Sequence, residues 1–433
     1  MNMMKQRKKV LFGFKSVPYP LRANGLSVRY LPIIEHLSRK HDIDLLLINS
    51  DPEELHHLDG VRGYCRKVMT LPDPHRHGVN AFRKILTYGR FLFPSSPPLS
   101  EVSHRGSMVT RGIVESIGGD HYDAIVWVGG DLLSHFVDAL PSISVGKIFV
   151  DFIDSPYLWA IRRKDALFPV RFLDRYDRWK TSRWEGSVIE KFDGAIYISR
   201  VDADAVPSRH GPTTKRAVIP NGVNLPAEGS RRTVTYPSPN IGFLGNMGYS
   251  PNVEAVEWLH KEVFVPLRKI RSDLTLVVIG RDPSEAIRKL GNEPGVIVTG
   301  AVEDIWEHIP AIDLFAFPLL RGAGLKNKIL ETMYAGRTIL TTGIGNEGID
   351  GVNGRDLVLC STSEDFRGEA LRLLSSPAER VRIGSSAIAF VQQKFSWEGI
   401  LRAYEDLILG GDEGDTIEGR DGERNPPAVA GTP

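Results

Sequence analysis

Short runs of apolar residues alternate with longer amphipathic stretches along most of the chain. Strands that alternate with helical patterns are typical of parallel α/β sheets, so the pattern predicts an α/β fold of two doubly wound, Rossmann-like domains. In the first half it predicts strands at residues 9–14, 43–48, 68–71, 124–129, 147–152, 194–199 and 217–222. In the second half it predicts strands at residues 241–245, 274–280, 296–300, 313–318, 338–342 and 356–360.

The alternation is interrupted at residues 223–239, where proline, glycine and arginine replace the large apolar residues. Such a stretch is typical of a linker. We therefore expect a first domain over residues 1–222 and a second over 240–395, with a helix at 396–410 that returns to the first domain. Residues 411–433 lack apolar periodicity and are expected to be disordered. A cleft between the domains is the expected binding site.

Composition narrows the class of protein. The 433 residues include 54 Lys and Arg against 53 Asp and Glu, so no basic excess points to nucleic acid. Two cysteines, Cys65 and Cys360, exclude a disulfide scaffold. No apolar run is as long as a membrane span, and residues 10–14 are too short for the core of a signal peptide. We expect a soluble, cytoplasmic protein.

The strongest chemical signal follows the strand at 313–318. A loop with Arg321 and Gly324 enters a helix near Lys326 and Lys328. A helix N-terminus presents free N–H groups to an anion, and glycines let the anion approach the backbone. Cations at this end oppose the helix dipole unless an anion is bound, which favours a diphosphate site. The alternative is a solvated pair of Lys328 and Glu331 on an ordinary surface helix.

A second candidate turn follows the strand at 241–245. Gly245 and Asn246 lie in this turn, and Ser250 with Pro251 fits the N-cap and first position of a helix. The turn is predicted either to contact the phosphates or sugar of a nucleotide or to be a plain connection between strand and helix. The sequence leaves both interpretations open.

Taken together, these segments resemble the family-4 (group 1) retaining glycosyltransferases of GT-B fold, in the variety associated with polysaccharide synthesis. The resemblance covers about residues 9–409. It is carried by the loop at 17–29 and by the motifs VIPNG at 218–222, FLGNMGYSPNV at 243–253, VIGRDP at 278–283, VTGAVED at 298–304 and the stretch 315–336.

The resemblance implies roles for individual residues. Gly25 and Arg29 would face the sugar and phosphates of the donor. The backbone near Val302 would read the base, and Glu331 would bind the ribose hydroxyls. Because residues 245–250 hold no cation, neutralisation of the diphosphate would fall on Arg321, Lys326 and Lys328.

Two departures from the family pattern concern catalysis. Ala323 stands where the family commonly has a first glutamate, and Ile153 stands where many members have a histidine. The next residue, Asp154, is expected either to orient the sugar or the acceptor hydroxyl, or to cap a helix that begins near Ser155. Lys328 is expected to stabilise the departing diphosphate. No metal is expected, because Asp202 and Asp204 open a predicted helix and are interpreted as capping residues.

These expectations amount to a metal-independent glycosyltransferase that needs no cofactor. It would move a sugar from a nucleoside-diphosphate sugar to a glycan or lipid-linked acceptor in cell-surface or exopolysaccharide synthesis. Because Ala323 and Ile153 depart from the family, a non-catalytic nucleotide-sugar sensor or partner subunit and a GT-B-type epimerase stay as alternatives. The basic, aromatic segment 159–184 predicts either peripheral contact with the inner face of the membrane or a solvated helix with an inward aromatic stripe.

Overall fold

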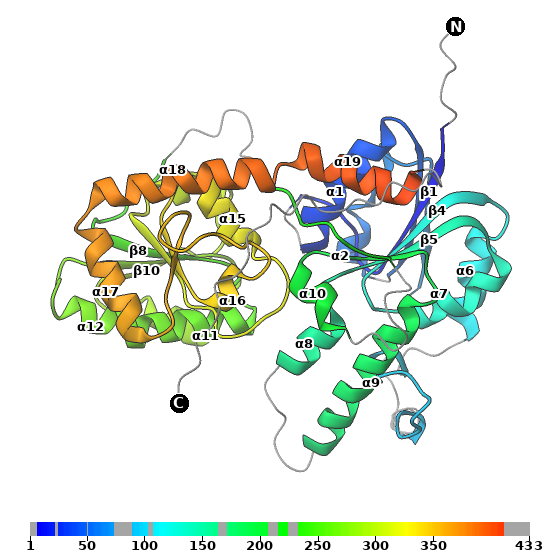
Figure 1. Cartoon of the computed structure of the whole chain (residues 1–433), viewed down its shortest axis with the longest axis horizontal. Coiled ribbons are helices and arrows are strands. Elements are labelled where there is room, and N and C mark those ends of the chain that lie inside the picture. Colours follow the sequence, from blue (N-terminus) through cyan, green and yellow to red (C-terminus); the bar gives the residue numbers. More distant parts are fainter. Residues whose placement is uncertain are drawn as a thin grey trace, which may run out of the picture.

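The structure is a computed structural model, and Figure 1 shows its two α/β domains side by side. It describes residues 7–21, 25–49, 51–72, 89–102, 107–162, 171–206, 215–223 and 233–410. The tail at 411–433 and residues 224–232 of the expected linker lie outside the described residues. Among the described helices, none combines the length and apolar character that crossing a bilayer would require.

The first domain is built on a seven-stranded parallel sheet in the order β3-β2-β1-β4-β5-β6-β7. Its central strands are apolar on both faces because helices cover both, as in other doubly wound sheets. The strands are β1 (Lys9–Phe14), β2 (Asp42–Ile48), β3 (Lys67–Leu71), β4 (His121–Val128), β5 (Ser144–Ile153), β6 (Gly194–Tyr197) and β7 (Lys215–Val218).

The second domain repeats this plan with a six-stranded parallel sheet in the order β10-β9-β8-β11-β12-β13. Its strands are β8 (Asn240–Leu244), β9 (Thr275–Ile279), β10 (Val296–Val298), β11 (Leu314–Phe317), β12 (Ile339–Thr341) and β13 (Val358–Leu359). Each described strand overlaps a predicted apolar run, although β7 shares only residues 217 and 218 with the strand predicted at 217–222. The predicted α/β class is confirmed.

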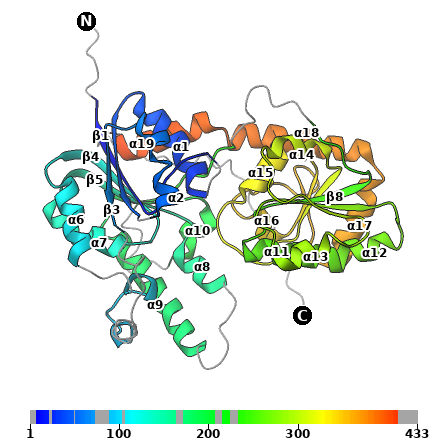
Figure 2. The ribbon, with the colours of Figure 1, turned by 180° about the vertical axis from the view of Figure 1, so that it is seen from behind.

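Helices connect successive strands and cover the sheets (Figures 1 and 2). Those of the first domain are α1 (Gly25–Ser38), α2 (Pro52–Leu55), α3 (Leu58–Arg62), α5 (Leu99–Val102), α6 (Ser107–Ile117), α7 (Leu133–Ala139), α8 (Pro156–Arg162), α9 (Arg171–Ile189) and α10 (Arg200–Ala205). Those that follow are α11 (Ser250–Trp258), α12 (Val265–Arg268), α13 (Glu285–Leu290), α14 (Ile305–His308), α15 (Asn327–Tyr334), α16 (Gly343–Asn346), α17 (Ser363–Leu374), α18 (Pro377–Lys394) and α19 (Trp397–Leu409).

The last two helices join the domains. In both views α18 runs along the second domain, and α19 continues onto the first, beside α1. Ile400, Tyr404 and Ile408 of α19 are buried in the same apolar core as Phe12 and Tyr30. The burial of these apolar side chains anchors the end of the described chain to the domain where it begins.

Candidate functional site

The candidate site lies where loops after the carboxyl ends of strands in the two sheets meet. The loop after β5 contacts the loop after β11 through Asp154 and Gly324. Asn221, beyond β7, donates a 3.1 Å hydrogen bond to Asn327, the first residue of α15. Ligands of open parallel sheets bind at the carboxyl ends of the strands, so this junction is where a ligand is expected.

Lys328, in the first turn of α15, is the central cation of this junction. Its Nζ donates to Oδ1 of Asn252 and lies 4.6 Å from the ring centre of Phe243. A Cβ placed on Gly245 would lie only 3.4 Å from the same Nζ. Burial, and after it the charge of Lys326, lowers the pKa of Lys328 to about 7. No carboxylate is among the groups that shift this pKa, so a bound anion would stabilise the charged form.

Lys326 and Asp154 meet at the same helix end from opposite domains. Lys326 occupies the N-cap position of α15, and its Nζ donates to the carbonyls of Gly324 and, at 3.1 Å, Ala323. A Cβ at residue 324 would lie 1.8 Å from Oδ1 of Asp154, and φ there is +69°, so this close approach requires glycine. Burial, reinforced by the charge of Asp202, raises the pKa of Asp154 to about 6.

The backbone is strained just before Asp154. Ile153 has φ of +64°, which is unfavourable for a β-branched residue. The pairing of β5 with β6 shifts register between Asp151 and Ile153, and Oδ1 of Asp151 accepts a 3.0 Å hydrogen bond from the Ile153 amide. Strain that persists at a strand end is typical of functional sites. Here it turns the chain so that Asp154 faces the second domain.

The capping interpretations of two aspartates are wrong. Ser155, not Asp154, caps α8, because its Oγ accepts a 3.1 Å hydrogen bond from the amide of Leu158. Ser199 caps α10, because its Oγ accepts a 3.1 Å hydrogen bond from the amide of Asp202. Asp202 instead accepts from the amide of Ser155 at 3.0 Å. Because Ser155 supplies the cap of α8, the carboxylate of Asp154 is free to face Gly324 at the junction.

Arg29 is a second correction. Its side chain is 0% exposed, so direct contact with a donor, expected from the resemblance, is wrong for this structure. The guanidinium donates to Asp151 at 2.8 and 3.1 Å, to the carbonyl of Ile219 at 2.9 Å and to Asn221 at 3.0 Å. Because Asn221 in turn bonds Asn327, Arg29 supports the start of α15 from within the first domain.

The turn before α11 also differs from expectation. The helix begins at Ser250 with Tyr249 at the N-cap, one residue earlier than predicted. Arg321 makes two 2.8 Å hydrogen bonds to Glu254 and one of 2.9 Å to the hydroxyl of Ser250. Its charge is therefore already balanced by a carboxylate. Of the three expected cations, Lys326 and Lys328 remain for a diphosphate.

The other expected contacts differ in how far they are exposed. Gly25 is exposed at the start of α1. The carbonyl of Asn246, next to Gly245, accepts a 2.8 Å hydrogen bond from Asn252, which also binds Lys328. Glu331 is half-buried on α15, one turn after Lys328. Val302 is half-buried against the apolar core of the second domain.

Two features were missed from the sequence. Arg162, at the end of α8, donates to the carbonyl of Gly322 at 2.9 Å and to Glu347 at 3.0 Å, which joins the domains. It lies in a segment interpreted as a surface helix, so no sequence signal distinguishes it. Asn252, which accepts the hydrogen bond from Lys328, could have been found from the sequence, because it follows Pro251 in the first helical turn after a predicted strand. The described part of the chain has no group of three or more His, Cys, Asp or Glu residues able to hold a metal ion.

Comparisons with known sequences match part of the chain. Residues 238–376 match the family described as glycosyl transferases group 1. An uncharacterised 44.6 kDa protein of the cps region of Klebsiella pneumoniae is 25% identical over 164 residues, which is 36% of this chain and 42% of that protein. An uncharacterised glycosyltransferase of Methanocaldococcus jannaschii is 26% identical over 157 residues, which is 34% of this chain and 40% of that protein. The match thus spans less than half the length of these relatives.

Solved structures resemble nearly the whole chain. HepE of Anabaena, in complex with UDP and glucose, has a TM-score of 0.63 at 14% identity and covers 93% of this chain and 99% of its own. Sucrose-phosphate synthase of Thermosynechococcus elongatus has a TM-score of 0.66 at 14% identity, covering 93% and 98%. At these identities the likeness shows the fold alone, which is the two-domain GT-B fold.

Proposed function

We propose, from the premise that residues 238–376 form a group 1 glycosyl transferase domain, that this chain transfers a sugar from a nucleoside-diphosphate sugar to an acceptor. The observation that carries the proposal is Lys328, a largely desolvated cation at a helix N-terminus whose pKa is lowered to about 7. Such a group is stabilised when a diphosphate occupies the site, because the anion supplies the charge partner that it lacks.

The chemistry follows from this charge distribution. When the bond between the anomeric carbon and the diphosphate oxygen breaks, the electron pair passes to the diphosphate. Lys326, Lys328 and the amide groups that begin α15 are placed to stabilise that charge, which is electrostatic catalysis. We propose that this set of groups serves in place of a metal or other cofactor.

The proposal assigns Asp154 a role toward the acceptor. It comes from the first domain, and burial raises its pKa to about 6, so its carboxylate is largely ionised at pH 7.5. We propose that it orients the acceptor hydroxyl, which attacks the anomeric carbon from the face that the diphosphate leaves and passes its proton to the departing diphosphate. Retention of configuration at that carbon is part of the same proposal, and it is supported by the resemblance to the retaining enzymes.

The acceptor that we propose is a glycan or a lipid-linked glycan of the cell surface. The relative encoded in the cps region of Klebsiella pneumoniae supports this setting. HepE has been solved with UDP-glucose, so UDP-sugars are the donors to test first.

The test is release of nucleoside diphosphate from UDP-, GDP- and ADP-sugars, with and without glycan acceptors. We expect acceptor-dependent release with one donor, and loss of that release in Lys328→Ala. Lys9→Ala is the matched control, because Lys9 pairs with Asp120 at the opposite end of the first sheet. Binding without turnover would favour a sensor instead, and conversion of the donor without an acceptor would favour an epimerase.

A further inference from the structure

One face of the first domain exposes a concentration of large apolar side chains. Of the fifteen such residues that the described chain exposes, five lie on α9 and on the segment 89–98 beside it. Phe93 and Phe172 are 66% and 65% exposed. The other three are Leu92, Leu173 and Trp179. Figures 1 and 2 show that α9 extends away from the seven-stranded sheet, so this face projects from the body of the domain.

The apolar side chains stand on a rigid support. Lys180 of α9 is buried, and its Nζ donates to the carbonyls of Phe91 and, at 2.6 Å, Phe93. Tyr176 packs edge-on against Phe91 at 5.4 Å and donates a 3.0 Å hydrogen bond to the carbonyl of Leu92. These bonds fix the segment 89–98 to α9. Leu92 and Phe93 are therefore exposed on a segment that hydrogen bonds hold in place.

Charge on this face is mainly positive, and Glu190, just after α9, is its exposed acidic residue. Within the described segments 89–102 and 171–183 every exposed charged side chain is an arginine: Arg90, Arg171, Arg175 and Arg183. The acidic residues of these segments are engaged inside the fold. Asp174 pairs with Arg178 at 2.7 Å, Asp177 accepts from the amide of Leu99 at 2.9 Å, and Glu101 is buried.

A pocket of about 260 Å³ opens beside the exposed side chains. Residues 94–97 line it on one side, and Lys180, Arg183 and Ser187 of α9 line it together with Lys191, which follows the helix. Asp138 of α7 is the only acidic residue in its lining. Three cationic side chains and four serine hydroxyls in a pocket of this size suit a phosphate group.

We infer that this face, defined by residues 89–98 and 171–191, docks on an anionic lipid bilayer. Exposed aromatic side chains surrounded by arginines fit the boundary between headgroups and acyl chains, and the arginines fit the lipid phosphates. The pocket receives one headgroup phosphate. The inference rests on the proposed function in one respect: it names the membrane as the place where a lipid-linked acceptor meets the cleft.

This surface differs from the one expected from the sequence. In the basic segment 159–184, Trp159, Phe172 and Trp179 are exposed, against the expected inward stripe, whereas Trp184 is buried as that stripe predicts. The segment at Leu92 and Phe93 lies far away in the sequence and is held at this face by hydrogen bonds from Lys180 and Tyr176.

The test is flotation of the full chain with vesicles. We expect the protein to float with phosphatidylcholine vesicles that contain about 30% phosphatidylglycerol, at about 50 mM salt, and to be released near 0.5 M salt. Phe93→Ser with Phe172→Ser, and separately Arg175→Glu with Arg183→Glu, should each weaken binding by about tenfold or more. The matched control is Ile270→Ser with Val381→Ser, two equally exposed positions of the second domain, which should float like the wild type.

Several results would overturn the inference. They are a wild type that does not float with anionic vesicles, surface variants that float like the wild type, and a control that loses binding equally. Each variant is also titrated with nucleoside diphosphate in the absence of lipid. Retained nucleotide binding without flotation overturns only the docking surface, whereas flotation without nucleotide binding supports it and overturns only the proposed function.

Discussion

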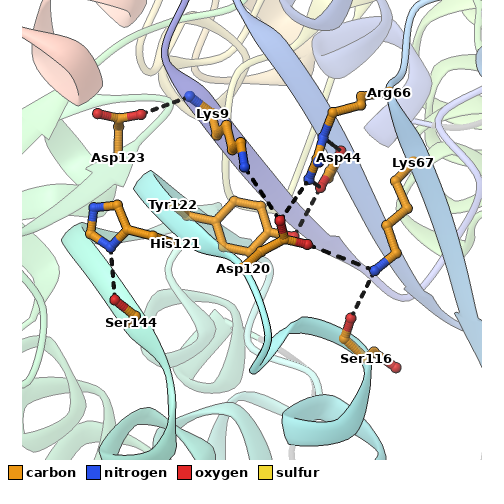
Figure 3. A network of polar contacts seen from close by, with 10 residues as sticks. All are labelled: Lys9, Asp44, Arg66, Lys67, Ser116, Asp120, His121, Tyr122, Asp123 and Ser144. Carbon is orange, nitrogen blue, oxygen red and sulfur yellow. Dashed lines mark hydrogen bonds and ion pairs between the residues drawn. The ribbon is translucent and has the colours of Figure 1, made fainter.

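Two polar clusters lie at opposite ends of the strands of the first sheet, and their charges are arranged differently. At the amino ends, Asp44 is buried and accepts hydrogen bonds from Arg66, one at 3.0 Å, and from the hydroxyl of Tyr122 at 2.9 Å (Figure 3). Asp120 joins the same cluster through ion pairs with Lys9 at 3.3 Å and Arg66 at 3.4 Å. Each carboxylate of this pair faces a cation within the protein.

At the carboxyl ends of the strands, the charges of the side chains are not fully balanced within the protein. Burial raises the pKa of Asp154, whereas the pKa of Asp120 is lowered, because the hydrogen bond from Lys9 and the nearby cations outweigh its desolvation. Burial lowers the pKa of Lys328, which has an amide oxygen as its hydrogen-bond partner. The amino-end cluster is complete in itself and stabilises the fold. In the proposed function a ligand completes the carboxyl-end cluster, so we expect this cluster to cost stability until a ligand binds.

The largest effect is expected from a substitution that breaks the amino-end cluster. Asp44→Ala removes the partner of Arg66 and Tyr122, and we expect it to lower the free energy of unfolding by about 3 kcal/mol. Urea denaturation measures this change. Nucleotide affinity of the folded variant should be unchanged, since the cluster lies at the far end of the strands. A loss below about 1 kcal/mol would mean that the buried pair is not needed for stability.

Asp154→Asn should separate activity from stability. We expect turnover to fall by about 100-fold or more, because the carboxylate that orients the acceptor is lost. Stability should rise by about 1–2 kcal/mol at pH 8, because a carboxyl whose pKa is raised by burial destabilises the fold once it ionises.

The sign of this stability effect can be checked against pH. Since the pKa of Asp154 is raised from its unfolded value of 3.8 to about 6, its contribution to stability is lost as pH rises through that window. Thermal unfolding of variant and wild type should therefore diverge between pH 4 and 6 and stay parallel above it. Equal curves at every pH would contradict the burial of this carboxylate.

Nucleoside-diphosphate affinity should depend on pH through Lys328. The anion binds the protonated amine, so affinity falls as pH rises above about 7, by at most about tenfold per pH unit. Titrations between pH 7 and 9 avoid protonation of the phosphate itself, whose pKa is near 6. In Lys328→Ala the slope should disappear. A wild-type slope of zero would show that Lys328 is not the group that titrates on binding.

The smallest expected effect concerns the ion pair between the domains. Arg162→Glu or Glu347→Arg alone should lower turnover several-fold, because each breaks the pair that holds the 322–324 loop, and exposed pairs contribute about 1 kcal/mol or less. The double variant restores opposite charges at the two positions and should recover part of the loss. If the double variant does not recover, the loss is due to the hydrogen bond between Arg162 and Gly322, not to the ion pair.

Much of the fold could be predicted from the sequence. Runs such as those at 9–14 and 274–280 are apolar throughout, and the alternation of such runs with helices leaves few arrangements besides parallel sheets. The candidate anion-binding loop could also be located, because Gly324, Lys326 and Lys328 are close in sequence and lie at one helix end.

The partners of individual charges could not be predicted in this way. Arg29 and Arg321 look like free cations in the sequence, but Asp151 and Glu254 neutralise them from positions 122 and 67 residues away. Local periodicity carries no information about such pairs, because tertiary packing brings them together. Asp154 was ambiguous for the same reason, since only the position of Ser155 decides which side chain caps α8.

Calorimetric titration of wild type, Lys328→Ala and the control Lys9→Ala with UDP, GDP, ADP and NAD tests most directly whether α15 begins a diphosphate site. We predict that wild type and Lys9→Ala bind one nucleoside diphosphate equally well. Lys328→Ala should bind it about 100-fold more weakly, as expected for loss of a desolvated charge partner. Equal affinity in all three proteins, or binding of NAD alone, would contradict a diphosphate site at this helix.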